Sequence, residues 1–360
     1  MNGTGSGGAM HRITNPDPVV IWGAGAMGGT LGAYLARAGR PVTFVDVVEP
    51  HVAAIRERGL RITGPIAEFT VKAPAVTADG LQGRHATILL AVKAHHTEAA
   101  TRALEPHLAA DGVVVSVQNG LNETVIARIV GESRTFGCFV NFGADYLEPG
   151  VIHFGGRGAV VVGETDGRLT DRARRIHEAF LTFDERAILS QNVWGFLWSK
   201  LAYASMLFAT ALANDSIADA LARPEHAALY AGLAREIVRV ATARGVRLEP
   251  FDGFDPRAFA ADSPAGAAER SLDDLVAHNR RSAKTHSGIW RDLAVRRRRT
   301  EVDAQLGPVV EYGGALGLAT PLNARLIELI HEIEDGRRPQ DLANLEVLAE
   351  TNAGPGDGRG

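Results

Sequence analysis

Apolar and polar positions follow a regular block pattern through the first half of the chain. Short apolar runs typical of buried strands occupy residues 19–22, 42–45, 86–91 and 113–116. Each run precedes a segment with apolar residues at helical spacing, namely 27–38, 51–58, 97–107 and 122–130. This alternation predicts a parallel sheet covered by helices on both faces. We also expect an extended stretch over 60–71 and two further strands, 151–153 and 159–162, that extend the sheet.

The pattern changes near Ser190, beyond which strand signals almost vanish. Apolar residues recur at helical spacing over 193–213, 228–244, 303–316 and 323–334, and Gly245 and Gly317 stand where two of these segments end. The stretch 251–274 is rich in Asp, Pro and Gly and fits either a loop with a short helix or a mobile flap. The second half is therefore predicted to be all-helical.

A glycine-rich turn joins the first strand to the first helix. Its sequence is Gly23-Ala24-Gly25-Ala26-Met27-Gly28. In a dinucleotide-binding turn the first glycine permits the tight bend, the second lets the backbone approach a pyrophosphate, and the third lets helix and strand pack closely. The phosphates then lie on unpaired N–H groups at the positive end of the helix. Because the turn has this strand–turn–helix context, it predicts dinucleotide binding; the alternative is a plain glycine-rich turn.

An acidic residue ends the second strand in the position that the fingerprint expects. Asp46 follows Gly25 by 21 residues, close to the usual spacing of about 20. A carboxylate there accepts hydrogen bonds from the adenosine ribose and repels a 2′-phosphate, and no Lys or Arg follows in 47–49. The position favours NAD over NADP; the alternative is an ordinary solvated Asp at a strand end.

These patterns predict an α/β fold, with an N-terminal Rossmann-type doubly wound sheet and an all-helical C-terminal domain. We place a tail at 1–18, the dinucleotide-binding domain at 19–190, the helical domain at 191–340 and a second tail at 341–360. A chain of 360 residues is long enough for two such domains.

Composition excludes several other classes of protein. A net charge of −4 argues against nucleic-acid binding, and the run 296–299 of four arginines is interpreted as a solvated helix face or a neighbour of an acidic substrate. Cys138 is the single cysteine, which excludes an internal disulfide and a cysteine-rich metal site. His95 and His96 are adjacent, without metal-ligand spacing, so no metal is expected. With no long apolar span and no signal peptide, we expect a cytoplasmic protein without membrane contact.

Polar residues follow two of the predicted strands, at the end of each strand where a parallel sheet binds its ligands. Lys93 follows the third strand and Gln118-Asn119-Gly120 follows the fourth, at the sheet edge where α/β proteins bind ligands. Turn and capping chemistry is the alternative for both. Lys200 lies in a helix that is apolar on nearly every face, so it either extends its amine to solvent or serves proton transfer. Glu301 alone looks like an ordinary carboxylate at a helix start.

These residues, in this order, resemble the ketopantoate reductase family. The matching segments are the glycine-rich turn, 91–93, 118–120, 198–201, 300–303 and 320–323. The resemblance implies an active site in a cleft between a Rossmann domain and a helical domain that binds substrate and forms a homodimer. It implies reduction of a 2-oxo acid by nicotinamide hydride, with Lys200 as general acid. Glu301 would bind a substrate hydroxyl and help position Lys200, while Asn119 and Lys93 would line the nicotinamide side.

Departures from the family pattern bear on the substrate. Ala204 and Phe208 stand where the family places two substrate-binding asparagines, and neither side chain forms hydrogen bonds. The expected serine aligns with Gly288, one residue after Ser287, and Trp290 lies nearby. Since the family commonly uses NADP, Asp46 is a further departure.

Three functions stay open at this point. The first is hydride transfer between NAD(P)H and a different 2-oxo acid, or a related carbonyl or alcohol, in either direction, with a less polar pocket lined by Ala204, Phe208 and Trp290. The second is an authentic 2-dehydropantoate 2-reductase of pantothenate biosynthesis. The third is an NAD-binding regulator without catalysis.

Overall fold

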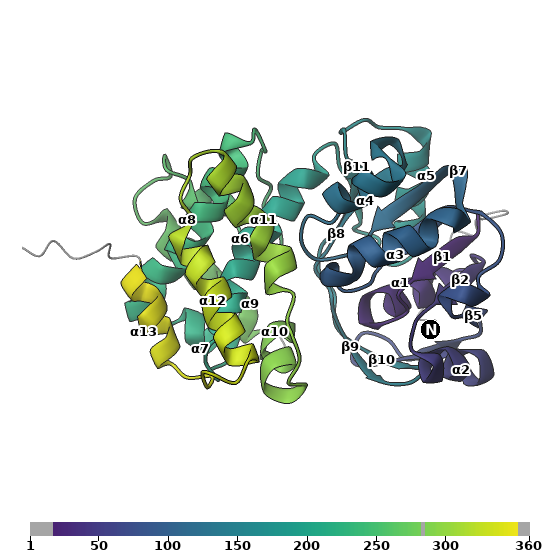
Figure 1. The fold of residues 1–360 in the computed structure, drawn as a ribbon, viewed down its shortest axis with the longest axis horizontal. Coiled ribbons are helices and arrows are strands. Elements are labelled where there is room, and N and C mark those ends of the chain that lie inside the picture. The colour runs from purple at the N-terminus through teal and green to yellow at the C-terminus, as the bar shows by residue number, and fades with distance from the viewer. Residues whose placement is uncertain (1–16, 282–284, 352–360) are drawn as a thin grey trace, which may run out of the picture.

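The computed structural model describes residues 17–281 and 285–351. An α/β half and a helical half lie side by side (Figure 1). The tail expected over residues 1–18 falls almost entirely outside the described residues, as does 352–360.

The main sheet has the strand order β12-β11-β8-β7-β6-β1-β2-β5. Its strands are β1 (Val19–Trp22), β2 (Val42–Val45), β5 (Ala75–Val76), β6 (His85–Leu90), β7 (Leu108–Ser116), β8 (Thr135–Val140), β11 (Val160–Glu164) and β12 (Ile188–Leu189). Pairing is parallel from β8 to β5, as the block pattern predicts. Strand β11 extends the sheet but runs antiparallel to β8, because a hairpin rather than a helix precedes it.

The helices of this half fall close to the predicted segments. They are α1 (Ala26–Arg37), α2 (Glu49–Arg58), α3 (Thr97–Leu104), α4 (Glu123–Val130) and α5 (Asp171–Leu181). The sheet edge formed by the carboxyl ends of β1, β6 and β7 therefore carries the glycine-rich turn, Lys93 and Asn119.

A second sheet, with order β4-β3-β10-β9, corrects the prediction for residues 151–153. Its strands are β3 (Leu60–Thr63), β4 (Phe69–Val71), β9 (Gly143–Glu148) and β10 (Val151–Gly156). Strand β10 was expected to extend the main sheet, but it pairs with β3 and β9. Its alternating buried residues, Ile152 and Phe154, face the core, and Ile152 packs so closely on α1 that a Cβ on Gly29 would lie 2.3 Å from it.

The second half is helical, as predicted. Its helices are α6 (Val193–Thr210), α7 (Ile217–Leu221), α8 (Ala227–Ala243), α9 (Ala267–Arg280), α10 (Gly288–Trp290), α11 (Val302–Ala315), α12 (Pro321–Glu334) and α13 (Ala343–Glu350). The stretch 251–274 is a loop with a 3₁₀ turn, Pro256–Phe259, that runs into α9. Helix α13 corrects the tail expected from residue 341: Leu345 and Leu348 are fully buried in the helical core, which fixes the segment.

The segment 320–323, one of those that resemble the family, forms the capped start of α12. The Glu236 carboxylate of α8 accepts hydrogen bonds from the backbone N–H groups of Leu322 and Asn323, both at 2.9 Å. The Asn323 side chain donates to the same carboxylate. Three donors at the positive end of α12 thus surround one buried carboxylate, so this motif is structural.

Glu123, at the start of α4, is a buried carboxyl whose two oxygens lack hydrogen-bond partners in the described part of the chain. Burial raises its pKa from 4.5 to about 8, against smaller opposing effects of its own backbone, Ser116 and Cys138. Between those two values the folded chain holds a proton that the unfolded chain has released, so folding stability falls as pH rises.

We expect Glu123→Gln to raise the free energy of unfolding by about 3 kcal/mol at pH 7, because the amide carries no ionisation penalty. The gain should grow between pH 5 and 8 and then level off, as followed by denaturant unfolding. A difference that does not change with pH would contradict the raised pKa.

Candidate active site

The glycine-rich turn has the geometry that the three glycine roles require. Gly23 has φ +99°, and a Cβ there would lie 2.9 Å from the backbone of Ala91. A Cβ on Gly28 would lie 2.1 Å from the Gly23 carbonyl oxygen. A Cβ on Gly25 would meet nothing within 4 Å, so this glycine keeps open space above the start of α1. No side chain caps that start, which leaves its N–H groups for a phosphate.

Asp46 closes the other side of this turn. Its Oδ2 accepts a hydrogen bond from the Ala24 backbone N–H at 2.8 Å, and Oδ1 accepts from Val48 N at 3.0 Å. The carboxylate is half-buried and therefore still reachable from solvent. The open space at Gly25, the uncapped helix start and this carboxylate fit a dinucleotide's pyrophosphate and adenosine ribose.

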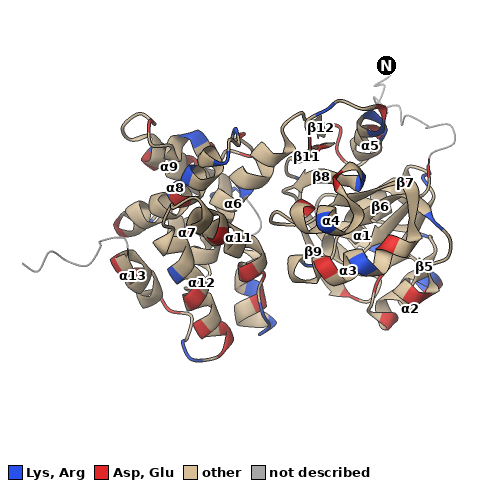
Figure 2. Cartoon of the chain, turned by 45° about the horizontal axis from the view of Figure 1, so that its top comes forward, with Lys and Arg blue, Asp and Glu red and all other residues tan. Residues whose placement is uncertain are grey.

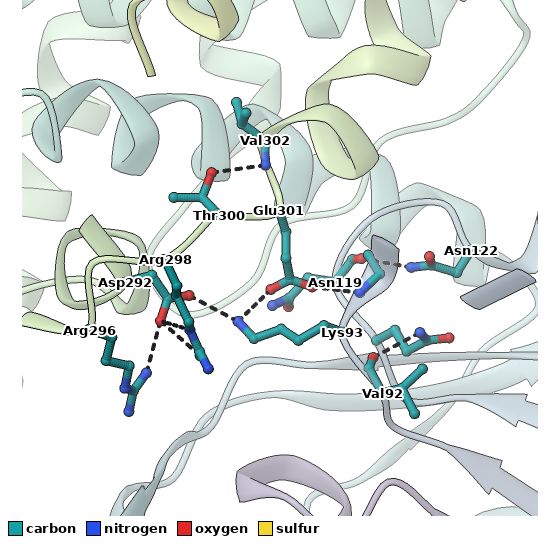
Figure 3. Close-up of polar contacts among 12 residues, drawn as sticks. Val92, Lys93, Asn119, Asn122, Asp292, Arg296, Arg298, Thr300, Glu301 and Val302 are labelled. Atoms are coloured by element: carbon teal, nitrogen blue, oxygen red, sulfur yellow. Dashed lines mark hydrogen bonds and ion pairs between the residues drawn. The ribbon is translucent and has the colours of Figure 1, made fainter. Parts of the chain in front are cut away.

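Lys93 reaches from the end of β6 to two buried carboxylates of the helical half (Figure 3). Its Nζ lies 2.9 Å from Glu301 Oε2 and 3.3 Å from Asp292 Oδ2. The other Glu301 oxygen accepts the Ala94 backbone N–H at 2.7 Å. Glu301 is 9% exposed, so it is much more than a solvated carboxylate at a helix start. It anchors the start of α11 to the turn after β6.

Asp292 is a residue of this cluster that the sequence reasoning missed. It also accepts hydrogen bonds from Arg296 and Arg298, both at 3.0 Å (Figure 3). Burial raises the pKa of the Asp292 carboxyl. The cations of Lys93, Arg296 and Arg298 outweigh burial and hold this pKa below its usual value. The arginine run at 296–299 is the signal in the sequence that points to Asp292, because clustered cations need an opposite charge nearby.

The arginine run itself is not a helix face, which corrects one of the two interpretations offered for it. It forms the connection between a π-helical turn, Arg291–Val295, and α11. Arg299 pairs with Glu334 at 3.0 Å and Asp335 at 2.6 Å. Lys and Arg are interspersed with Asp and Glu over both halves in Figure 2, so the view shows no broad basic face.

Lys200 projects from α6 toward the edge of the main sheet. Its Nζ donates a hydrogen bond to Asn119 Oδ1 at 2.8 Å and another to the Val140 carbonyl oxygen, and it lies 5.3 Å from the centroid of the Phe139 ring. The turn that carries Asn119 also packs against α11, since a Cβ on Gly120 would lie 3.3 Å from the Ala304 carbonyl oxygen. The structure thus brings Lys200, Asn119, Glu301 and Lys93 to one region between the two halves.

Gln118 has a structural role, in agreement with the alternative that its segment serves turn and capping chemistry. It is buried, and its amide donates to the Val92 carbonyl oxygen at 2.9 Å and to Thr97 Oγ1 at 2.8 Å. It therefore ties the turn after β7 to the turn after β6, and so fixes the spacing between Asn119 and Lys93.

Of the two α6 residues predicted to line the substrate pocket, one lies near Lys200 and the other does not. Ala204 follows Lys200 by one helical turn and is 8% exposed. Phe208 is fully buried in the helical core, so the expectation that it lines an open pocket is corrected. Eight helical steps rotate a side chain about 80° away from Lys200, whereas seven steps return it to within about 20°. Leu207, which is half-buried, therefore lies on the Lys200 face instead.

Ser287 and Trp290 lie at α10, which packs against α6. Ser287 is buried, and its hydroxyl oxygen accepts the Trp290 backbone N–H at 3.1 Å as a helix cap. The half-buried Trp290 indole donates to Asn214 Oδ1 at 3.2 Å and packs on His286, with ring centroids 4.1 Å apart. The tryptophan is thus held in place, while the serine oxygen is already engaged.

Two polar contacts that the sequence did not reveal join the halves. Arg291 forms an ion pair with Asp145 of β9 at 2.5 Å. Asp252, which adopts φ +41°, accepts hydrogen bonds from Asn141 Nδ2 at 2.7 Å and Ala159 N at 2.9 Å. Both contacts link residues more than 90 positions apart.

The described residues, 17–281 and 285–351, contain neither a cluster of metal ligands nor a membrane-spanning helix. Among them, no three His, Cys, Asp or Glu side chains converge as metal ligands would. No helix in the same ranges combines the length and the apolar character needed to cross a bilayer.

Comparison with known proteins covers nearly the whole described chain. Residues 19–167 match the family model for ketopantoate reductase PanE/ApbA, and residues 192–334 match the model for its C-terminal part. A 2-dehydropantoate 2-reductase of Pyrococcus abyssi is 29% identical over 319 residues, which are 87% of this chain and 96% of that protein. One of Halobacterium salinarum is also 29% identical, over 316 residues that are 87% of this chain and 97% of the relative.

Solved structures agree with these matches. A PanE/ApbA family ketopantoate reductase from Ralstonia eutropha superposes with a TM-score of 0.75 at 28% identity, covering 89% of this chain and 99% of that one. A D-mandelate dehydrogenase bound to NADH and anilino(oxo)acetate has the same fold, with a TM-score of 0.76 at 22% identity, covering 89% and 98%. The chain belongs to the ketopantoate reductase family of nicotinamide-dependent oxidoreductases.

Proposed function

We propose that this protein interconverts a 2-oxo acid with an apolar side chain and the corresponding 2-hydroxy acid, using NAD(H). The observation that carries the proposal is the position of the Lys200 amine. It comes from the helical half and lies against Asn119 and the Val140 carbonyl at the sheet edge that also bears the dinucleotide turn. A carbonyl placed between that amine and a bound nicotinamide would have a proton source on one side and a hydride source on the other.

In the reducing direction NADH bound at the glycine-rich turn would supply the hydride that reaches the carbonyl carbon. The electron pair of the C=O π bond moves to oxygen, and Lys200 transfers a proton from Nζ to that oxygen, which gives the hydroxy acid. The ammonium also stabilises the negative charge as it develops. In the oxidising direction the neutral amine accepts the hydroxyl proton. Asn119 and the Val140 carbonyl hold Nζ in place for both steps.

The proposed preference for NAD(H) rests on Asp46. Its carboxylate lies beside the turn at the end of β2, where a 2′-phosphate would meet a like charge. Lys and Arg are absent from 47–49, so no neighbouring cation on this connection offsets that repulsion. The NADH-bound mandelate dehydrogenase supports the proposal only as far as showing that this fold accommodates NADH.

The proposed substrate class rests on α6 and α10. Ala204 and Leu207 share a face with Lys200, and Trp290 lies on the helix that packs against it. None of these side chains offers a strong partner for a substrate hydroxyl, since the Trp290 N–H is already bonded to Asn214. The named relatives favour a second candidate, 2-dehydropantoate 2-reductase itself.

A grid of two cofactors and two substrates tests the proposal. Ketopantoate and 3,3-dimethyl-2-oxobutanoate differ only in one hydroxyl, and NADH and NADPH differ only in the 2′-phosphate. We expect kcat/KM to be at least about tenfold higher for the substrate without the hydroxyl, and at least about tenfold higher with NADH.

Each of the other possible outcomes of this grid supports a different conclusion. A clear preference for ketopantoate would establish the second candidate and contradict the apolar pocket. A preference for NADPH would contradict the role of Asp46. Cofactor binding without turnover of any 2-oxo or 2-hydroxy acid would indicate the regulator. A homodimer through the helical half is proposed from the family resemblance alone, and the cytoplasmic location stays an expectation from the composition of the sequence.

A further inference from the structure

His51 lies in the first turn of α2 and is almost fully buried, with 1% of its surface exposed. Both ring nitrogens are engaged by backbone groups from distant parts of the α/β half. Nε2 lies 2.9 Å from the Ala24 carbonyl oxygen, in the middle of the dinucleotide-binding turn. Nδ1 lies 2.9 Å from the Gly150 backbone nitrogen, at the tip of the β9–β10 hairpin.

These two contacts define one tautomer of the ring. The Gly150 N–H can only donate, so Nδ1 must be the acceptor and carry no hydrogen. The proton of the neutral imidazole is then on Nε2, where it donates to the Ala24 carbonyl. Tyr146 of β9 packs edge-on against the ring, with centroids 5.0 Å apart, and keeps the imidazole plane in this orientation.

Ala24 is consequently held on both of its peptide groups by one short segment. Asp46 accepts its N–H at 2.8 Å, and His51, five residues later, donates to its carbonyl at 2.9 Å. The next residue, Gly25, is the N-cap of α1, and the N–H groups at this helix start, which no side chain caps, are the expected donors to a pyrophosphate. Fixing the peptide plane between Ala24 and Gly25 therefore fixes the direction of the first of these donors.

We infer that His51 is a positioning residue for dinucleotide binding: its Nε2–H holds the Ala24 carbonyl and so orients the backbone donors of the glycine-rich turn. The pyrophosphate is common to NADH and NADPH, so the effect is the same for both cofactors. It does not depend on which 2-oxo acid the protein uses or on the preference set by Asp46.

Two amide substitutions separate the two ring contacts. In His51→Gln the amide nitrogen reaches the place of Nε2, so the donor to Ala24 is kept. In His51→Asn the amide oxygen takes the place of Nδ1, so the acceptor for Gly150 is kept and the donor to Ala24 is lost. We expect the Kd for NADH to stay within about twofold in His51→Gln and to rise about tenfold in His51→Asn.

Turnover gives a readout that loss of stability would not imitate. In His51→Asn, the KM for NADH and for NADPH should rise together, while kcat at saturating cofactor and the KM for the 2-oxo acid stay unchanged. His85 is the matched control: it is a half-buried histidine whose Nε2 contacts the Gln82 carbonyl oxygen at 3.0 Å, and its Gln and Asn variants should leave cofactor binding unaltered.

Equal NADH affinity in the wild type and in His51→Asn would overturn the inference, as would weaker binding in His51→Gln than in His51→Asn. Should either variant fail to fold, ¹⁵N NMR of the wild-type imidazoles decides. The inference requires the His51 signal, assigned by mutation or by its contacts, to show a proton on Nε2 in the presence of NADH. A proton on Nδ1 would overturn it.

Discussion

Replacing Lys200 by methionine is expected to lower kcat for 2-oxo acid reduction about 10²–10⁴-fold, the usual contribution of a positioned proton donor. Methionine keeps the unbranched stem of the lysine but supplies neither a proton nor a positive charge. The developing oxyanion would then be protonated by water. The Kd for NADH should change little, because the dinucleotide turn lies on the other half of the molecule and its contacts are intact.

Three measurements make this result specific. Deuterium at C4 of the NADH should give a larger kinetic isotope effect on kcat in the variant, since the chemical step becomes slower than product release. Any fall of kcat/KM at high pH in the wild type should be absent from the variant, which carries no ionisable group at this position. Lys72→Met is the matched control, because Lys72 is exposed and donates to the Glu57 carbonyl oxygen. A rate within about threefold of the wild type would remove Lys200 from the mechanism.

The surroundings of Lys200 explain why its position is well defined. Two oxygens accept from Nζ, and the Phe139 ring lies beside the amine. The Asn119 backbone is held in turn by the Asn122 side chain, which donates to the Asn119 carbonyl oxygen at 2.7 Å and accepts from Thr97 Oγ1 at 2.8 Å. This chain of hydrogen bonds transmits the geometry of the main sheet to an amine on the helical half.

Short sequence motifs predict the parts of the site that a single turn or a strand end forms. The glycine spacing predicts three different environments, and the structure shows a tight bend at Gly23, open space at Gly25 and close packing at Gly28. The position of Asp46 beside this turn follows from its distance along the chain, because a parallel strand returns its carboxyl end to the same sheet edge. The same rule predicts the positions of Lys93 and Asn119, whose roles stay predictions.

Contacts between distant segments were not accessible in this way. The second sheet pairs β3 with β10, about 90 residues later, and nothing in the short pattern of 151–153 distinguishes that pairing from an extension of the main sheet. No local motif assigns Asp292 or His51 to the site, and only the fold shows that they meet Lys93 and Ala24. Phe208 was misplaced because the family pattern gave its position while the helical period and burial decide its direction.

The second large effect is expected at Glu301. Glu301→Ala should lower kcat/KM about 100-fold, because it removes a buried carboxylate that binds both Lys93 Nζ and the Ala94 backbone N–H. Loss of that link frees the start of α11 from the turn after β6, and this turn borders the segment that carries Asn119. Glu301→Gln keeps one acceptor and should lose less activity than the alanine variant.

The same substrate pair separates two roles for this carboxylate. If Glu301 binds a substrate hydroxyl, as the family resemblance implies, its removal should affect ketopantoate far more than 3,3-dimethyl-2-oxobutanoate. If it acts by anchoring the two halves, both substrates should lose activity equally, and this is the result we expect for an apolar pocket. Measuring kcat/KM of the wild type and the variant with each substrate gives the coupling energy between the Glu301 side chain and the substrate hydroxyl. Unchanged kcat/KM with both substrates would show that the Glu301–Lys93 pair serves only folding, which a lowered Tm would then report.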